Sequence, residues 1–247
     1  MSVLDRERAR YWLDRWDAQQ ERYVADREER FAVIIDVVRE TVGVQPSVLD
    51  LGCGPGSLGA RLRETLPGAR VVGLDADPLL MGLGRARYPE LEFVDADLAD
   101  PSWSSRVPGT VDAAVSTTAL HWLGPSALEG LYARLASLIR PGGVFVNGDH
   151  LHSESPRLDA LAGKIRASRE IRAGVTGNEG WREWWGAVRA DPELSPLFGQ
   201  CSERAMPHGG DNGLSVAEHV DLLRDAGFAE AGPLWQSGDD TVLVALR

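Results

Sequence analysis

The sequence predicts an α/β fold, in which helices cover both faces of a mostly parallel sheet. Short apolar runs alternate with helical patterns from Ser47 onward, and a glycine-rich turn follows the first run. A second turn, 140–143 (Arg-Pro-Gly-Gly), separates a helical pattern from the fifth apolar run. Such alternation is typical of parallel sheets, because each crossover helix packs back on the sheet. The 247 residues are enough for one large domain of this class.

The same patterns place the individual elements. Residues 4–42 carry helical patterns with an apolar stripe and no strand signal, whereas residues 149–214 break the alternation and are too long for an ordinary connection. Ser215 is the expected N-cap of the last helix, with Glu218 as its capping-box partner. The expected strands are 48–51, 70–75, 91–95, 111–115, 143–148, 232–236 and 241–246, and the expected helices include 57–66, 128–139 and 216–226.

Composition narrows the classes of partner. A formal net charge of −11 disfavours nucleic acid, because phosphate binding needs a basic surface. Cys53 and Cys201 form no disulfide framework, which fits a reducing compartment and a cytoplasmic location. No apolar run has the length of a membrane span, and the N-terminus is charged rather than signal-like. We expect a monomer or homodimer acting on a small molecule, without nucleic-acid or membrane partners.

The most informative segment is the turn after the first predicted strand. An apolar run ends in Asp50, and Gly52, Gly54 and Gly56 follow directly before a helical pattern. Glycines allow the positive φ angles of such a turn and let a ligand approach the backbone. A strand, a glycine turn and a helix start in this order are typical of a site for a nucleoside-containing cofactor.

The glycines leave two cofactor classes open. Gly54-x-Gly56-x-x-Gly59 satisfies the dinucleotide fingerprint, with Asp75 at a suitable distance for a ribose hydroxyl. Against a dinucleotide, the charge of Asp50 would repel a pyrophosphate, whereas a cationic aminoacyl-sulfonium ligand would be attracted to it. A further carboxylate, Asp97, follows the third apolar run, where an adenine amino group could be bound.

Together these residues resemble a known family. Residues 48–56 (VLDLGCGPG), Asp75, residues 96–98 (Ala-Asp-Leu) and the segment around 140–143 resemble class I S-adenosylmethionine-dependent methyltransferases of the small-molecule type. The resemblance covers about 48–146 and the C-terminal hairpin. It implies a Rossmann-like, mostly parallel seven-stranded sheet with an antiparallel last strand. It also implies one domain with a helical N-terminal lid and a helical cap after the fifth strand, divided as 1–42 (lid), 43–148 (cofactor-binding core), 149–214 (substrate cap) and 215–247 (C-terminal helix and hairpin).

The expected cofactor is S-adenosyl-L-methionine. Asp50 would orient the turn and bind the ammonium group, and Asp75 would accept both ribose hydroxyls. By the resemblance, Asp97 binds the adenine amino group and the Leu98 amide the ring, with Asp95 as the alternative to Asp97. Ser116 and Thr117 end the fourth strand, beside the first strand, where open α/β sheets bind ligands. The full cofactor-binding set is Asp50, Gly52, Gly54, Gly56, Asp75, Ala76, Asp97, Leu98, Ser116 and Thr117.

Histidines and aromatic residues are the candidates for the acceptor side. His121 and His150 are the candidate catalytic bases and also substrate contacts, because an unperturbed imidazole titrates near neutrality. His121 is equally compatible with an aromatic filler role. The remaining expected substrate contacts are Tyr23, Trp181 and Trp185, whereas Trp184 is expected to pack on the sheet and His219 to face solvent.

The sequence predicts no metal site, and it leaves other activities beside methyl transfer open. His150 and His152 with Asp149, Glu154 or His208 do not form a complete ligand set, so we expect no metal. The predicted function is methyl transfer to a small organic molecule by in-line displacement, with an oxygen, nitrogen or carbon acceptor. One alternative is another S-adenosylmethionine-using enzyme, of the carboxy-S-adenosylmethionine synthase type that the C-terminal segment also resembles. The others are an NAD(P)-dependent oxidoreductase and a catalytically silent protein that binds the cofactor for assembly or regulation.

Overall fold

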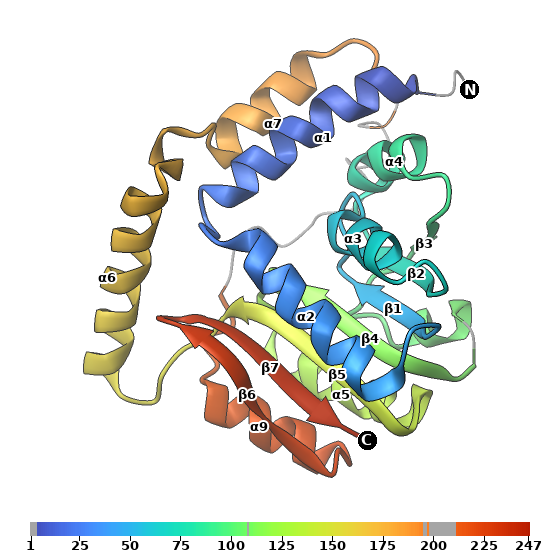
Figure 1. The fold of residues 1–247 in the computed structure, drawn as a ribbon, viewed down its shortest axis with the longest axis vertical. Helices are drawn as coiled ribbons and strands as arrows, with labels where there is room; N and C mark the ends of the chain where they lie inside the picture. The colour runs from blue at the N-terminus through green and yellow to red at the C-terminus, as the bar shows by residue number, and fades with distance from the viewer. Residues whose placement is uncertain (1–3, 108, 195–196, 198–210) are drawn as a thin grey trace.

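A single mixed sheet forms the centre of the computed structural model (Figure 1). The structure describes residues 4–107, 109–194, 197 and 211–247. Within them the sheet has seven strands in the order β3-β2-β1-β4-β5-β7-β6, and β7 runs antiparallel to both neighbours while the other pairs are parallel. The predicted fold class is therefore confirmed. The strands are β1 (Ser47–Leu51), β2 (Arg70–Asp75), β3 (Glu92–Asp95), β4 (Val111–Thr117), β5 (Ile139–His150), β6 (Glu230–Ser237) and β7 (Asp240–Leu246).

Helices cover both faces of this sheet. One face packs on α5 and α9 around Phe145 and Tyr132, and the other packs on α2 and α3 around Phe31 and Leu62. The α-helices are α1 (Arg6–Glu21), α2 (Arg27–Val42), α3 (Ser57–Thr65), α4 (Pro78–Arg87), α5 (Pro125–Leu138), α6 (Pro156–Ala173), α7 (Trp181–Ala190) and α9 (Val216–Asp225). The 3-10 turns are η1 (Pro101–Arg106), η2 (Leu120–Trp122) and η3 (Val175–Gly177).

A third apolar cluster joins helix α1 of the predicted lid to helix α7 of the predicted cap. Helices α1, α4 and α7 share this cluster, and Figure 1 shows α1 and α7 side by side above the sheet. Trp184 of α7 is fully buried, with its ring 5.9 Å from Trp12 and 5.0 Å from Trp16 between centroids. The prediction that Trp184 packs on the sheet is therefore wrong: Trp184 is buried, but against α1.

The turn at 140–143 differs from its prediction. It lies inside β5, because Ile139 already pairs with Val111 and pairing resumes between Val144 and Ala113. The intervening residues form an irregularity in the ladder, with φ of +77° at Gly142. Helix α5 accordingly ends one residue earlier than expected, at Leu138.

The prediction that His219 faces solvent is wrong. His219 is 1% exposed, and its Nδ1 lies 2.8 Å from the hydroxyl oxygen of Tyr132 on α5. It stands one helical turn before the fully buried Leu223, so the helical period puts both on the face that packs against α5.

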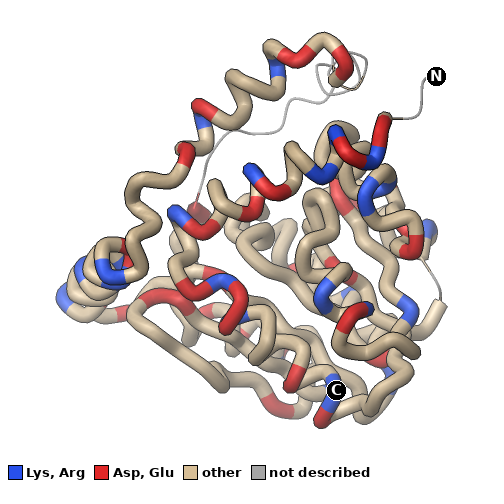
Figure 2. The backbone as a smooth tube through the Cα atoms, turned by 45° about the horizontal axis from the view of Figure 1, so that its top comes forward, with Lys and Arg blue, Asp and Glu red and all other residues tan. Residues whose placement is uncertain are grey.

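Charge and hydropathy bear on the predicted partners. Figure 2 shows Lys and Arg interspersed with Asp and Glu along the chain. Within the described residues, no helix combines the length and apolar character needed to cross a bilayer, and no group of three or more His, Cys, Asp or Glu could hold a metal ion. Cys201 and His208 lie outside the described residues.

We expect Trp184→Ala to lower the free energy of unfolding by about 3–5 kcal/mol, because it leaves a large cavity between α7 and α1. Trp181 lies on the same helix but is 39% exposed, so Trp181→Ala should cost at most about 1 kcal/mol. Urea unfolding followed by circular dichroism measures both. Equal losses in the two variants would contradict the packing role of Trp184.

Candidate active site

The glycine turn between β1 and α3 has the backbone that the sequence predicts. Gly52, Gly54 and Gly56 have φ of +64°, +54° and +84°, a region that favours glycine. A Cβ on Gly52 would lie 2.4 Å from the Ala119 Cβ, and one on Gly56 would lie 2.8 Å from the Phe93 ring. Side chains at these two positions are therefore excluded by space as well as by backbone conformation.

The predicted acids lie at adjacent strand ends. Asp50 is on β1, Asp75 ends β2, and Asp97 follows β3, so they occupy the carboxyl ends of three neighbouring strands. Asp75 accepts hydrogen bonds from the amides of Gly54 (2.7 Å) and Asp77 (2.8 Å). Asp97 is exposed and accepts one from the Ala99 amide at 2.8 Å. The structure thus places Asp75 against the glycine turn, Asp50 against the first turn of α3, and Asp97 after the next strand along the same edge.

Burial perturbs two of these acids. Asp50 is 1% exposed, and its Oδ2 accepts a hydrogen bond from the Gly59 amide at 3.1 Å, while Oδ1 has no partner. Burial raises the pKa of Asp50 to about 7 and that of Asp75 to about 6, although backbone amides favour the ionised form of both. Unmet negative charge at a turn of this kind suits a cationic ligand.

The other predicted cofactor residues fall into two groups. Ala76 and Leu98 follow Asp75 and Asp97 directly, at the same edge of the sheet. Ser116 is fully buried and donates its hydroxyl hydrogen bond to the Leu51 carbonyl at 2.8 Å, so it holds β4 against β1. Thr117 is partly exposed and precedes Thr118, whose φ of +50° is unusual for a non-glycine residue.

Helix α1 lies against the glycine turn. The Trp16 ring lies 3.9 Å from the position that a Cβ on Gly54 would take. Asp17 accepts a hydrogen bond from the Ser57 hydroxyl at 2.9 Å and pairs with Arg27 (2.7 Å) and Arg61 (3.1 Å). These contacts hold the end of α1 to the start of α3.

The predicted aromatic contacts meet each other. The Tyr23 hydroxyl oxygen accepts a hydrogen bond from the Trp181 amide at 3.1 Å. The Trp181 ring lies 5.5 Å from Trp185 and 5.7 Å from Trp16 between centroids. The loop between α1 and α2 is thus joined to the start of α7.

The candidate histidines flank a buried acid that ends β5. His121 Nδ1 lies 2.9 and 3.0 Å from the two carboxylate oxygens of Asp149, which is 1% exposed. The His150 amide donates to the same carboxylate at 2.9 Å. The pairing of His121 with Asp149 was not predicted, since the two residues are separated by 28 positions.

The two histidines have opposite charge preferences. Burial alone would lower the pKa of His121, but the hydrogen bond and charge of Asp149 outweigh it and raise that pKa above its ordinary value. Burial also opposes ionisation of Asp149, yet His121 lowers its pKa. Burial, together with Arg30, lowers the pKa of His150 to about 3, so this ring stays neutral.

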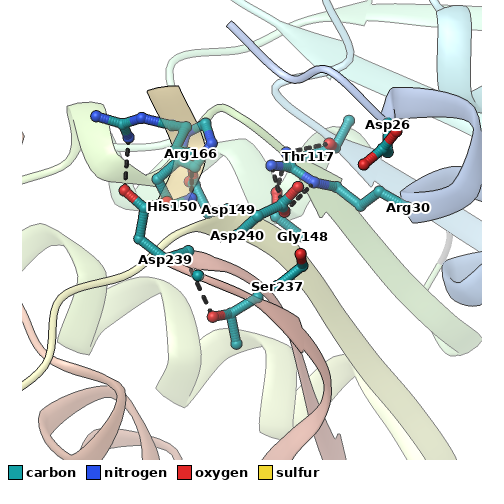
Figure 3. Close-up of polar contacts among 12 residues, drawn as sticks. Asp26, Arg30, Thr117, Gly148, Asp149, His150, Arg166, Ser237, Asp239 and Asp240 are labelled. Carbon is teal, nitrogen blue, oxygen red and sulfur yellow. Dashed lines mark hydrogen bonds and ion pairs between the residues drawn. The ribbon is translucent and has the colours of Figure 1, made fainter. Parts of the chain in front are cut away.

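Arg30 of α2 is a buried residue of this region that sequence reasoning missed. Figure 3 shows its guanidinium directed at Asp240, Gly148 and Thr117. The Nε–Oδ1 distance to Asp240 is 2.7 Å, and Nη1 lies 3.2 Å from the Gly148 carbonyl oxygen and 3.4 Å from the Thr117 hydroxyl. The sequence does indicate the burial of Arg30, because it lies one helical turn before Ile34, on the apolar face of the helix.

Cap helix α6 is tied to the same cluster. Arg169 pairs with Asp26, the N-cap of α2, and lies 3.7 Å from Asp240. Arg166 pairs with Asp239 at 2.7 Å, as Figure 3 shows. Alternating charges therefore connect the predicted lid, the predicted cap and the β6–β7 hairpin.

Comparison with known proteins decides the family. Residues 48–143 match the family model described as a methyltransferase domain. The chain therefore contains a methyltransferase domain, and the match supports the class I S-adenosylmethionine-dependent type that the sequence resembles. The chain is 33% identical over 181 residues to a trans-aconitate 2-methyltransferase of Methylobacterium radiotolerans. The matched segment covers 72% of this chain and 60% of that protein. Another, of Azoarcus sp., is 36% identical over 129 residues, covering 52% and 48%.

Several solved structures share the fold of this chain. An O-methyltransferase family protein from Burkholderia thailandensis superposes with a TM-score of 0.57 at 19% identity, covering 93% of this chain and 62% of that one. Human N-acetylserotonin methyltransferase in complex with S-adenosylmethionine gives 0.53 at 17% identity, covering 93% and 56%. The chain matches about half the length of its first curated relatives, between 40% and 60%.

Removing the Asp75 carboxylate should weaken cofactor binding. We expect Asp75→Ala to bind S-adenosylhomocysteine at least about tenfold more weakly, since it loses a charged acceptor beside the Gly54 amide. Isothermal titration calorimetry measures the affinity. Asp100→Ala is the control, because Asp100 also accepts a backbone hydrogen bond but is exposed and outside the predicted set. Unchanged affinity in Asp75→Ala would remove this residue from the site.

Cofactor affinity should also depend on pH. A cation binds the ionised carboxylates, so affinity for S-adenosylmethionine should rise as pH increases through the pKa values of Asp75, about 6, and Asp50, about 7. Binding at pH near 6.5 should release protons, which calorimetry in two buffers of different ionisation enthalpy detects. Asp50→Asn should lose the upper step. A cofactor affinity that stays constant or falls as pH rises over this range would refute the proposed attraction between the cation and these two carboxylates.

Proposed function

We propose that this protein transfers a methyl group from S-adenosylmethionine to a small organic acid. The observation that carries the proposal is the glycine turn with buried acids at adjacent strand ends, in a chain of this methyltransferase family. The glycine spacing alone would also allow a dinucleotide cofactor, but ionised Asp50, buried below the turn, would repel a diphosphate.

The residues present fit the cofactor. The buried Oδ1 of Asp50 lacks a partner, and Gly52, Gly54 and Gly56 put no side chain between a ligand and their own backbone. Asp50 would favour the ammonium group, Asp75 the ribose, and Asp97 with Leu98 the adenine, while Ala76 and Thr117 would line the site. When bound, S-adenosylmethionine supplies a methyl group on a positively charged sulfur, which is an activated electrophile.

The names of the relatives support an acid as the acceptor. Two matched proteins are named trans-aconitate 2-methyltransferases, and trans-aconitate is a carboxylic acid. A carboxylate is already deprotonated, so no base is required. His121, which pairs with Asp149, supplies positive charge on the acceptor side, while the neutral His150 can make one hydrogen bond there.

Lid and cap roles follow from the same contacts. Residues 1–42 would cover the cofactor, supported by Trp16 and Asp17 at the glycine turn. Residues 149–214 would cover the acceptor and exclude water, with Tyr23, Trp181 and Trp185 as apolar walls. From the sequence we further propose a cytoplasmic monomer or homodimer without a nucleic-acid partner.

Turnover with acids tests the function. Release of S-adenosylhomocysteine should depend on an added di- or tricarboxylic acid, and mass spectrometry should show a product heavier by one methyl group in place of one proton. The fully esterified acids are the matched controls, because they lack the anionic oxygen. Turnover with alcohols or amines but not with acids would replace the proposed acceptor, and binding of cofactor without any turnover would refute the proposed activity.

A further inference from the structure

The contact between His121 and Asp149 leaves one ring nitrogen available. The Nδ1 atom lies 2.9 and 3.0 Å from the two carboxylate oxygens of Asp149. Because carboxylate oxygens only accept hydrogen bonds, Nδ1 carries a proton. Within the part of the chain that the structure describes, no hydrogen-bond partner is found for Nε2, and the side chain is 26% exposed. Nε2 is therefore the atom that the ring can offer to a bound molecule.

Nε2 has two possible roles. A neutral ring with its proton on Nδ1 offers a lone pair at Nε2 and acts as a base. A doubly protonated ring offers an Nε2–H donor and a positive charge. The first role suits a hydroxyl acceptor, and the second suits an acceptor that is already anionic.

The charges around the ring favour the protonated form. Asp149 of β5 and Asp211, which precedes α9, favour the imidazolium, whereas Arg30 of α2 opposes it. The charge of Arg30 is largely met by Asp240, 2.6 Å away. His150, whose amide also bonds Asp149, is neutral and adds no positive charge.

We propose that His121 acts as an imidazolium whose Nε2–H donates a hydrogen bond to a carboxylate of the acceptor, and that Asp149 is the positioning residue that orients this ring and holds its charge. The inference rests on the proposed function, since it takes the acceptor to be an organic acid. No proton leaves or joins the ring: the acceptor arrives as an anion, and the imidazolium stays protonated throughout.

A fixed cation in this place would govern specificity. It attracts anionic acceptors and repels cationic ones, because a charge at a partly buried site is weakly screened. The donor also fixes the orientation of the carboxylate. Positioning of a nucleophile contributes strongly to rate in displacement reactions.

Imidazole titration tests the charge without using turnover. In the cofactor-free protein, the His121 C–H resonances in NMR should titrate above the ordinary value of about 6.5. In Asp149→Asn they should titrate at lower pH, whereas Asp159→Asn, which removes an acid paired with His152 instead, should leave them unchanged. A His121 that titrates below the ordinary value in the wild type, or that ignores Asp149→Asn, would overturn the proposal.

Ligand titration tests the hydrogen bond. Trans-aconitate should shift the His121 resonances and raise their titration midpoint, and its trimethyl ester should do neither. No shift with the acid would overturn the inference. A shift without turnover of any acid would support the inference and refute the proposed function, so the two failures are distinguishable.

The pH dependence of turnover separates a donor from a base. At saturating cofactor, kcat/KM for the acid should fall as pH rises through the His121 midpoint, and in Asp149→Asn the fall should begin at lower pH. His121→Gln, which keeps a neutral donor, should lose this limb and about tenfold or more of kcat/KM at neutral pH. A rate that rises through the midpoint would show a base instead. Unchanged S-adenosylhomocysteine affinity in both variants confirms that they fold.

Discussion

Buried carboxylates lie along the carboxyl edge of the sheet, and the way each is compensated decides what this edge can bind. A buried carboxylate is costly unless hydrogen bonds or a cation compensate it. Asp50 and Asp75 are bonded to backbone amides, and burial still raises the pKa of both. Asp149 has a cationic partner, His121, and its pKa is lowered. The β1–β2 side therefore attracts a cation, and the β5 side presents one. This division matches a sulfonium cofactor and an anionic acceptor.

The helices outside the sheet are joined to this edge by charges as well as by apolar packing. Asp17 connects α1 to Ser57 at the start of α3, and Arg30 connects α2 to Asp240 at the start of β7. Arg169 extends the second connection to cap helix α6. Ion pairs buried in this way contribute less to stability than their number suggests, because desolvation offsets their attraction. Their geometric effect is to fix the positions of α1, α2 and α6 relative to the strand ends.

The sequence was sufficient for features that depend on neighbouring residues. The positive-φ glycines after Asp50 and the acids at three successive strand ends follow from local patterns, and the structure has them in place. Contacts between distant segments could not be predicted. His121 meets Asp149 only because β4 and β5 are adjacent, and Arg30 reaches Gly148 across 118 positions. The burial of His219, by contrast, follows from the helical period, which places it on the same face as Leu223.

The two sides of the edge make opposite demands on pH. Asp50 and Asp75 favour a cation only when ionised, so we expect cofactor affinity to decline as pH falls below about 7 and then about 6. His121 carries positive charge only below its raised pKa, so affinity for an anion declines at higher pH. Both conditions must hold during turnover, and the bond from His121 to Asp149 extends their overlap toward alkaline pH. A hydroxyl acceptor would need a neutral ring at the same pH, with Asp149 orienting it as a base. The choice between the two acceptors therefore depends on whether the His121 ring is charged at the pH of turnover, and the neighbouring charges of Asp149 and Asp211 favour the charged ring.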